Sequence, residues 1–161
     1  MKALVTYFSP TGTTKDIALK LAEVLNADLF EIAPMVQYSE KDLDWRDPKS
    51  RSSVEMKNAN SRPEIADKLT NIKDYNPIFI GFPIWWYKAP TIINTFLESY
   101  DWNGKTIIPF ATSGGSDYGK TNDSLIKSCK HAKLLDGSLI ERKAHKHKLK
   151  EWVDSLKIDK I

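Results

Sequence analysis

Residues 3–14 read ALVTYFSPTGTT, and this stretch decides the fold. Its first part is apolar almost throughout, as in a strand buried on both faces of a parallel sheet, so we expect a strand over 2–8. A hydroxyl-rich turn with a single glycine follows at 9–14. From Thr13 onward, apolar residues recur at the spacing of an amphipathic helix that ends at Asn26. Such a turn brings free backbone N–H groups and the positive end of the helix dipole together at one point. The stretch therefore predicts a strand–turn–helix unit that binds a phosphate.

The same alternation continues along the chain. Apolar runs predict further strands at 28–33, 77–82, 106–111 and 133–140, and helical spacings predict helices at 62–72, 89–100, 120–131 and 145–157. Strands that alternate with helices form a parallel sheet covered on both faces. We therefore expect one domain over 1–161, with a five-stranded, doubly wound sheet in a three-layer α/β/α fold. Segment 34–63 departs from this pattern. It is long, polar and interrupted by prolines. Either it has a function, or its secondary structure is not the one that the sequence pattern predicts.

Composition narrows the class of protein. The chain has 161 residues, enough for one domain with a full core, and no run approaches the about 20 apolar residues of a membrane span. It begins directly in a strand pattern without the regions of a signal peptide, and its single cysteine excludes an internal disulfide. These features favour the cytoplasm. The net charge of +3 comes with no nucleic-acid-binding motif, so the basic stretch at 142–150 indicates a solvated face or a surface for an acidic partner.

Loop one, residues 9–14, is the candidate phosphate site. Its hydroxyls are hydrogen-bond donors, and its glycine lets the backbone approach a ligand closely or adopt a positive φ. It lacks the lysine of a triphosphate-binding loop and the three glycines of a dinucleotide-binding loop, which disfavours both ligands. A neutral nest of this kind fits a single terminal phosphate. The alternative is a plain capping turn rich in threonine. The candidate phosphate residues are Ser9, Thr11, Gly12, Thr13 and Thr14.

Two more loops follow strands of the predicted sheet. Loop two, residues 83–88, contains three consecutive aromatic residues, and neighbours in an extended segment point apart, so at least one is expected to be exposed. Exposed aromatic side chains at a strand end suit a flat conjugated ligand. Loop three, residues 112–119, contains three glycines whose N–H groups can face the carbonyls of a ligand, and its Tyr118 could stack on the opposite ring face. The alternatives are that loop two covers the core and that loop three is a flexible turn.

A phosphate nest, a slot for a ring between two further loops, and no set of metal ligands together describe a mononucleotide with a large planar ring, which is FMN. With SPTGTT at 9–14, GFPIWW at 81–86 and the 112–119 loop, the chain resembles the flavodoxins and flavodoxin-like reductases over nearly its whole length. The resemblance implies the strand order 2-1-3-4-5 and non-covalent FMN, with the phosphate at loop one. It implies that the ring lies between residues of the other two loops: Pro83, Ile84, Trp85, Trp86, Tyr87, Ser113, Gly114, Gly115, Asp117 and Tyr118.

Two redox functions remain open. The first is a flavodoxin-like redox protein that passes electrons from FMN to a partner protein or a small acceptor, with no catalytic side chain of its own. The second is an NAD(P)H-dependent quinone or nitro-compound reductase. It is motivated by the basic balance and by the long 34–63 segment, whose Trp45, Arg46, Arg51 and Arg62 could wall the flavin or receive a nicotinamide phosphate. The absence of glycine from 83–88 weakens the one-electron carrier role that the resemblance implies. A third class, a flavin-free module, fits the aromatic triplet poorly. The sequence leaves the oligomeric state open.

Overall fold

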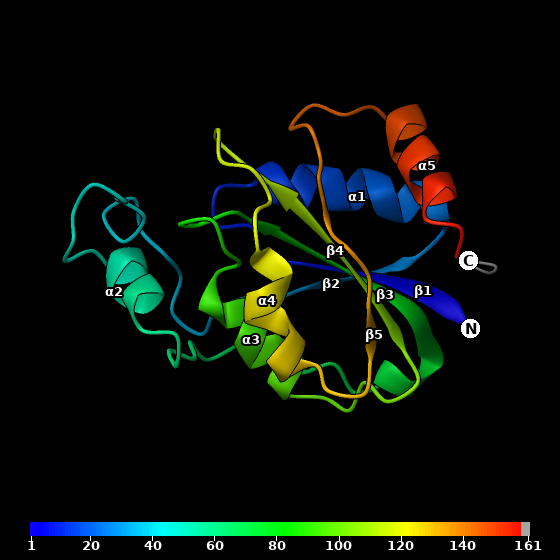
Figure 1. Ribbon diagram of the computed structural model, residues 1–161, viewed down its shortest axis with the longest axis horizontal. Helices are drawn as coiled ribbons and strands as arrows, with labels where there is room; N and C mark the ends of the chain where they lie inside the picture. Colours follow the sequence, from blue (N-terminus) through cyan, green and yellow to red (C-terminus); the bar gives the residue numbers. More distant parts are fainter. Residues whose placement is uncertain (159–161) are drawn as a thin grey trace.

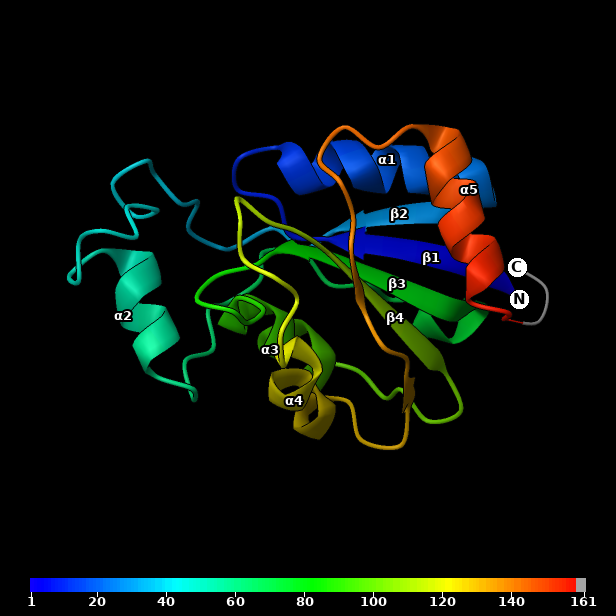
Figure 2. The same cartoon turned by 45° about the horizontal axis from the view of Figure 1, so that its top comes forward.

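The computed structural model describes residues 1–158 and shows a parallel sheet between two layers of helices (Figures 1 and 2). The strand order is β2-β1-β3-β4-β5, with β6 also paired to β4, which confirms the predicted three-layer fold. Helices α1 (Thr13–Leu25) and α5 (Lys146–Ser155) cover one face, and α3 (Thr91–Glu98) and α4 (Thr121–Leu125) cover the other. The strands are β1 (Lys2–Tyr7), β2 (Asp28–Glu31), β3 (Tyr75–Pro83), β4 (Thr106–Thr112), β5 (Lys133–Leu134) and β6 (Ser138–Leu139).

Each face of the sheet has its own core. Successive strand residues point to opposite faces, so Leu4 joins the cluster under α3 while Val5 joins the cluster under α1 and α5. In the same way Ile78 and Ile80 pack on one side of β3 and Phe79 on the other. This double burial explains why the central strands are apolar without alternation.

The winding of the chain reverses between β1 and β3. From β1 the chain crosses to β2 on one side, and it returns to place β3 on the other side of β1. Ligands of such sheets bind outside the carboxyl ends of the strands at this reversal. The topology therefore brings loop one, after β1, next to loop two, after β3.

Segment 34–63 and its continuation differ from the prediction. The helix expected over 62–72 is absent, and the chain there is irregular apart from an isolated antiparallel bridge between Ile65 and Pro34. Its backbone pairs with the chain after β2 instead: the Met35 N–H donates to the Glu64 carbonyl at 2.8 Å, and the Ala66 N–H donates to the Ala33 carbonyl at 2.8 Å. Hydrogen bonds to another segment thus replace those that a helix would make within itself.

A helix that the sequence did not predict lies inside the 34–63 segment. Helix α2 (Arg51–Lys57) projects at one end of the molecule, away from the sheet (Figure 1). Its N-cap is Ser50, whose side chain accepts from the Ser53 N–H, and Arg51 pairs with Glu55 one turn later at 3.0 Å. A cap and an ion pair stabilise this short helix. Neither produces a hydrophobic stripe, so periodicity could not reveal it.

The fifth strand is broken in two. Residues 133–134 pair with the start of β4 and residues 138–139 with its end, while the expected strand covered 133–140 without a break. The carbonyl of Leu135 leaves the ladder and accepts from the Asn122 side chain at 2.8 Å. At Gly137 the Tyr118 ring lies where a β-carbon would stand, so the break and the glycine both make room for that ring.

The remaining helices are shorter than predicted. Helix α4 ends at Leu125 and continues only as a 3₁₀ turn, η2 (Ile126–Ser128), and a second 3₁₀ turn, η1 (Ile72–Asp74), precedes β3. Helix α1 ends as predicted, because Asn26 adopts φ 50° and its N–H bonds back to the last turn. Within residues 1–158 no helix is both long and apolar enough to span a bilayer.

Candidate functional site

Three loops meet at the carboxyl ends of β1, β3 and β4. The Thr14 hydroxyl of loop one lies 2.9 Å from the Thr112 hydroxyl at the end of β4, and this pair is buried. The Thr112 carbonyl accepts from the Ile84 N–H of loop two at 2.9 Å. Farther along, the Thr121 hydroxyl lies 3.5 Å from the Tyr87 carbonyl, which joins loop two to the end of loop three. Residues that are distant in sequence therefore form one continuous rim.

Loop one has the geometry of an anion site. Gly12 has φ 89° in the left-handed region, and a β-carbon there would meet no atom within 4 Å, so the surface above it is open. Helix α1 has 13 residues and no side-chain cap at Gly12. Among the described residues, the N–H groups of 11–14 have no recorded partner, as is usual for a first helical turn that binds an anion.

The four hydroxyls of loop one divide into two pairs. Ser9 accepts from the Lys15 N–H at 2.9 Å, and Thr14 is buried against Thr112, so both hold the loop in shape. Thr11 is exposed and Thr13 half-buried, and their hydroxyl oxygens lie 3.5 Å apart. These two side chains are the ones that a ligand at the turn can reach.

Loop two is a tight turn with aromatic residues at its tip. The N–H and carbonyl of Trp85 bond to the carbonyl and N–H of Lys88 at 2.9 and 3.0 Å. The two residues between them, Trp86 and Tyr87, have φ values of 48° and 63°. This is the pattern of a type I′ turn, which usually contains asparagine and glycine. Trp86 is 41% and Tyr87 63% exposed, and Trp85 is half-buried. Pro83 and Ile84 form the half-buried start of the loop.

Loop three is placed less simply. Gly114 and Gly115 are exposed, and the Gly115 N–H donates to the Ser113 hydroxyl at 3.1 Å. Asp117 is exposed. Tyr118, however, donates its hydroxyl proton to Asn122 at 2.6 Å and packs on Gly137, and burial raises its pKa. The ring of Tyr118 is therefore occupied in packing against the broken fifth strand, and ring stacking by this residue stays a prediction.

Several residues beside the loops were missed by the sequence analysis. Thr112 was placed in loop three but was not selected as a site residue. Arg142 donates from its Nε to the Ser113 carbonyl at 3.2 Å, which fixes a positive charge against loop three. Tyr38 and Phe8 pack against Trp85, with ring centroids 5.6 Å apart in each case. The basic stretch at 142–150 was a signal for Arg142, but its distance in sequence hid the contact.

The arginines of the 34–63 segment are all paired with carboxylates. Arg46 contacts Asp44 at 3.4 Å, Arg51 contacts Glu55 at 3.0 Å, and Arg62 contacts Glu98 at 2.8 Å. Each guanidinium thus already has an anionic partner. The segment, which is described in full, therefore has no unpaired arginine that could readily bind a nicotinamide phosphate.

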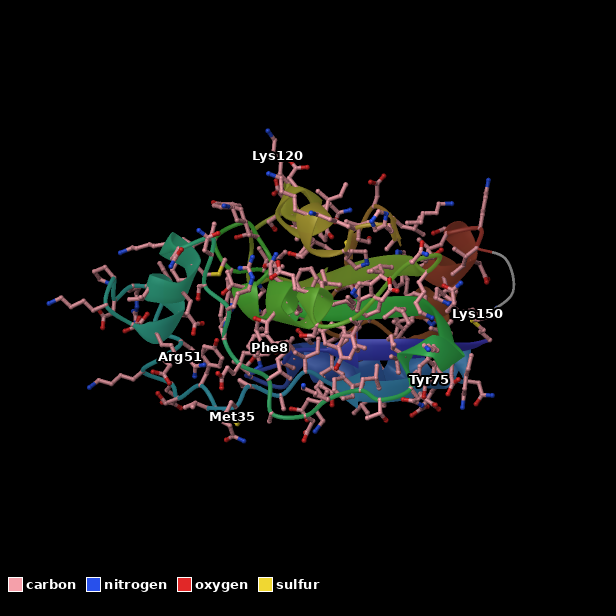
Figure 3. All side chains as sticks on the ribbon, turned by 90° about the horizontal axis from the view of Figure 1, so that it is seen from below. Phe8, Met35, Arg51, Tyr75, Lys120 and Lys150 are labelled. Carbon is pink, nitrogen blue, oxygen red and sulfur yellow. The ribbon has the colours of Figure 1, made fainter. Side chains whose placement is uncertain are left out.

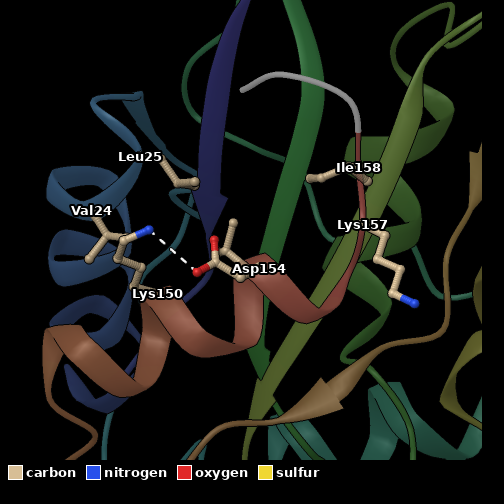
Figure 4. Close-up of a pocket in the computed structure, with 7 residues that line it drawn as sticks. Val24, Leu25, Lys150, Asp154, Lys157 and Ile158 are labelled. Atoms are coloured by element: carbon tan, nitrogen blue, oxygen red, sulfur yellow. Dashed lines mark hydrogen bonds and ion pairs between the residues drawn. The ribbon is translucent and has the colours of Figure 1, made fainter.

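One cavity lies at the candidate site, and another lies apart from it. A cavity of about 210 Å³ lies beside loop one, lined by Phe8, Ser9, Glu31 and Tyr38 among others. A more open one of about 330 Å³ lies between the end of α1 and α5, where Lys150 and Asp154 form an exposed pair (Figure 4). The second is lined by residues from the last turn of α1 and from α5 onward, and by none from the three loops.

The rim has the features that a ribityl phosphate with a flat ring needs. It offers unpaired N–H groups and two reachable hydroxyls at one end and exposed aromatic faces at the other, as the candidate FMN site requires. In addition, Thr91 begins α3 just after loop two, and its buried hydroxyl has no hydrogen-bond partner among residues 1–158. Buried polar groups are rarely left unpaired.

Comparison with known proteins gives a consistent result. The family model described as flavodoxin matches residues 2–156. A crystal structure of a candidate flavoprotein from Bacteroides eggerthii is 44% identical, covering 98% of this chain and 99% of that one, with a TM-score of 0.92. One from Bacteroides uniformis is 46% identical, covering 95% and 97%, with a TM-score of 0.90. A Lactobacillus acidophilus flavoprotein in complex with FMN is 24% identical, covering 94% and 98%, with a TM-score of 0.68, and shares the fold. A search among curated proteins found no match.

Proposed function

The chain belongs to the flavodoxin family, and on that premise we propose that it binds FMN non-covalently at loops one to three and transfers electrons to a partner protein or a small acceptor. FMN is the cofactor of this family, and when bound it supplies the redox chemistry. The observation that carries the proposal is the buried Thr14–Thr112 contact, because it joins the phosphate loop to the ring loops in one rim.

The residues of the chain divide the work between binding and exposure. The N–H groups of loop one, with Thr11 and Thr13, bind the phosphate without a cationic side chain in the loop. Trp86 and Tyr87 provide the apolar faces for the ring, while Trp85 supports the turn from the core side. Ser113, Gly114 and Gly115 line the opposite loop with backbone groups.

The second candidate is a reductase that takes hydride from NAD(P)H. One observation favours it: Arg142 and Lys88 place positive charge on loops three and two, and flavodoxins that act as carriers are usually acidic. The paired arginines of the 34–63 segment argue against it. We therefore rank electron transfer to an acceptor first.

The test uses the two ends of the cofactor. The double variant Thr11→Ala, Thr13→Ala should weaken FMN binding by at least about a hundredfold, the loss expected for two hydrogen bonds to a charged group, and leave riboflavin binding nearly unchanged. Flavin fluorescence quenching measures both affinities. Trp86→Ala should weaken both ligands, and Thr70→Ala, at an exposed residue outside the three loops, should weaken neither. Equal weakening of FMN and riboflavin by the double variant would remove loop one as the phosphate site.

A further inference from the structure

The 34–63 segment contacts the proposed site through three aromatic rings. Phe8, Tyr38 and Trp85 form a closed triangle, because all three pairs of ring centroids are 5.6 Å apart and meet edge to face, at angles of 67°, 83° and 70°. Phe8 comes just before loop one, Trp85 belongs to loop two, and Tyr38 belongs to the 34–63 segment. Edge-to-face pairs of aromatic rings attract each other beyond the effect of their buried area. The triangle thus connects the segment to both loops.

A polar clamp from α2 holds Tyr38 in this triangle. The Arg51 guanidinium carbon lies 3.7 Å from the centroid of the Tyr38 ring. The Tyr38 hydroxyl donates to Glu55 at 2.5 Å, and Arg51 donates to the other oxygen of Glu55 at 3.0 Å. Arg51 also donates to the Val36 carbonyl at 2.6 Å, two residues before Tyr38. In Figure 3, Phe8 lies between Arg51 toward one end of the molecule and Tyr75 and Lys150 toward the other.

The clamp is a built feature and not a chance surface contact. The side chains of Arg51 and Glu55 are only 24% and 15% exposed, so their pairing is partly shielded from water. Burial and the hydrogen bond to Glu55 raise the pKa of Tyr38, so that its phenol stays protonated and donates. Arginine is suited to this place, since it can stack on a ring and bond a carboxylate at once.

Trp85 belongs to both the triangle and the aromatic turn. Both backbone groups of Trp85 bond to Lys88 and close the turn that presents Trp86 and Tyr87. We propose that α2 is a positioning element for the flavin site: Arg51 and Glu55 fix Tyr38, Tyr38 fixes Trp85, and Trp85 sets the turn. The proposal rests on the proposed function and assigns a role to the 34–63 segment.

The experiment compares two arginines of the same segment. Arg51→Met removes the clamp. Arg62→Met removes a comparable ion pair, since Arg62 bonds Glu98 at 2.8 and 3.1 Å, but it does not contact the triangle. We expect Arg51→Met to weaken FMN and riboflavin alike by about tenfold, the equivalent of about one aromatic contact, and to change the visible circular dichroism of the bound flavin. Arg62→Met should bind both flavins like the wild type.

Two further measurements keep the proposal testable. Tyr38→Phe retains the ring and should lose less affinity than Tyr38→Ala, and Arg51→Lys tests the case in which Arg51→Met fails to fold. In flavin-free protein, acrylamide quenching with and without Trp85→Phe isolates the signal of Trp85, which should become more accessible in Arg51→Met only. Failure of the wild type to bind FMN would refute the proposed function but leave this second readout valid. Unchanged flavin affinity and unchanged Trp85 accessibility in Arg51→Met would overturn the positioning role.

Discussion

At the scale of single residues, the turn at Trp86 and Tyr87 is the most costly conformation in the site. Both residues are in the left-handed region, where bulky side chains cost of the order of 1–3 kcal/mol. The four-residue turn forms because Trp85 is held by its ring contacts and its pairing with Lys88. The two exposed rings are thus presented at the expense of some folding stability. This is expected where the residue type is determined by ligand binding and not by folding.

Tyr87→Gly tests this trade. Glycine adopts a positive φ without strain, so the flavin-free variant should be more stable than the wild type, by about 1 kcal/mol, in urea unfolding. The same change removes one apolar face, so FMN affinity should fall. Lys88→Gly, at the exposed neighbour, should not stabilise the protein, because Lys88 has no positive φ. A Tyr87→Gly variant that is less stable than the wild type would refute the strain argument, and one that binds FMN equally well would refute the binding role of the Tyr87 ring.

Sequence could predict the aromatic triplet as an exposed site but could not tell which indole lies inside. That choice depends on contacts of Trp85 with Phe8 and Tyr38, which come from other segments. The buried pairing of Thr14 with Thr112 was hidden for the same reason. A hydroxyl-rich loop indicates a binding site. Which of its hydroxyls are free and which are structural depends on their partners across the sheet.

At the scale of elements, the buried strands and amphipathic helices were predictable because burial imposes a period on their sequence. The prediction of a helix over 62–72 was wrong, because the backbone there bonds to the chain after β2. Helix α2 was missed because it buries few apolar side chains. The broken fifth strand shows a third cause: Tyr118 comes from another element to fill the space above Gly137. Local pattern fails where the partner of a backbone or side chain is distant in sequence.

The contact of Glu98 in α3 with Arg62 should make the folding stability depend on pH. Glu98, the last residue of α3, accepts from Arg62 and from Ser128, and the Arg62 bonds, followed by the Ser128 bond, hold its pKa below the ordinary value. A carboxyl with a lowered folded pKa adds stability above its unfolded pKa and loses it as the pH falls through the folded value. Glu98→Gln should therefore lower the free energy of unfolding by about 0.5–1 kcal/mol near neutral pH, a value discounted for partial exposure.

The difference between wild type and Glu98→Gln should shrink as the pH falls from the ordinary glutamate range through the lowered pKa of Glu98, because the wild-type carboxyl then also becomes neutral. Urea unfolding at several pH values measures it. Glu40→Gln, at an exposed residue, provides the control for loss of a carboxylate in general. A Glu98→Gln difference that stays constant from neutral to acid pH would show that the ion pair does not link the 34–63 segment to α3.

At the scale of the whole molecule, binding features gather at one end. The carboxyl ends of the strands, the three loops and α2 lie there, while both the start of β1 and the last turn of α5 lie at the opposite end (Figure 2). The topology made this end predictable from the order of elements alone. Whether the 34–63 segment could receive a nicotinamide phosphate was not predictable, because that depends on which charges near the loops are already neutralised, and ion pairs such as Arg51 with Glu55 appear only in the fold.

The last prediction concerns the electron source. With Arg46, Arg51 and Arg62 each held by a carboxylate, a nicotinamide phosphate finds no free guanidinium in the 34–63 segment. We therefore expect NADPH, mixed anaerobically with the FMN-loaded protein, to bleach the visible flavin band no faster than it bleaches free FMN. Chemical reduction should bleach it fully, which shows that the bound flavin is competent. Adding a flavodoxin reductase with NADPH should then restore rapid bleaching if the protein is a carrier. Rapid bleaching by NADPH alone would instead establish the reductase. The first residues to substitute would then be Arg142, which bonds the Ser113 carbonyl of loop three, and Lys88, which lies in loop two.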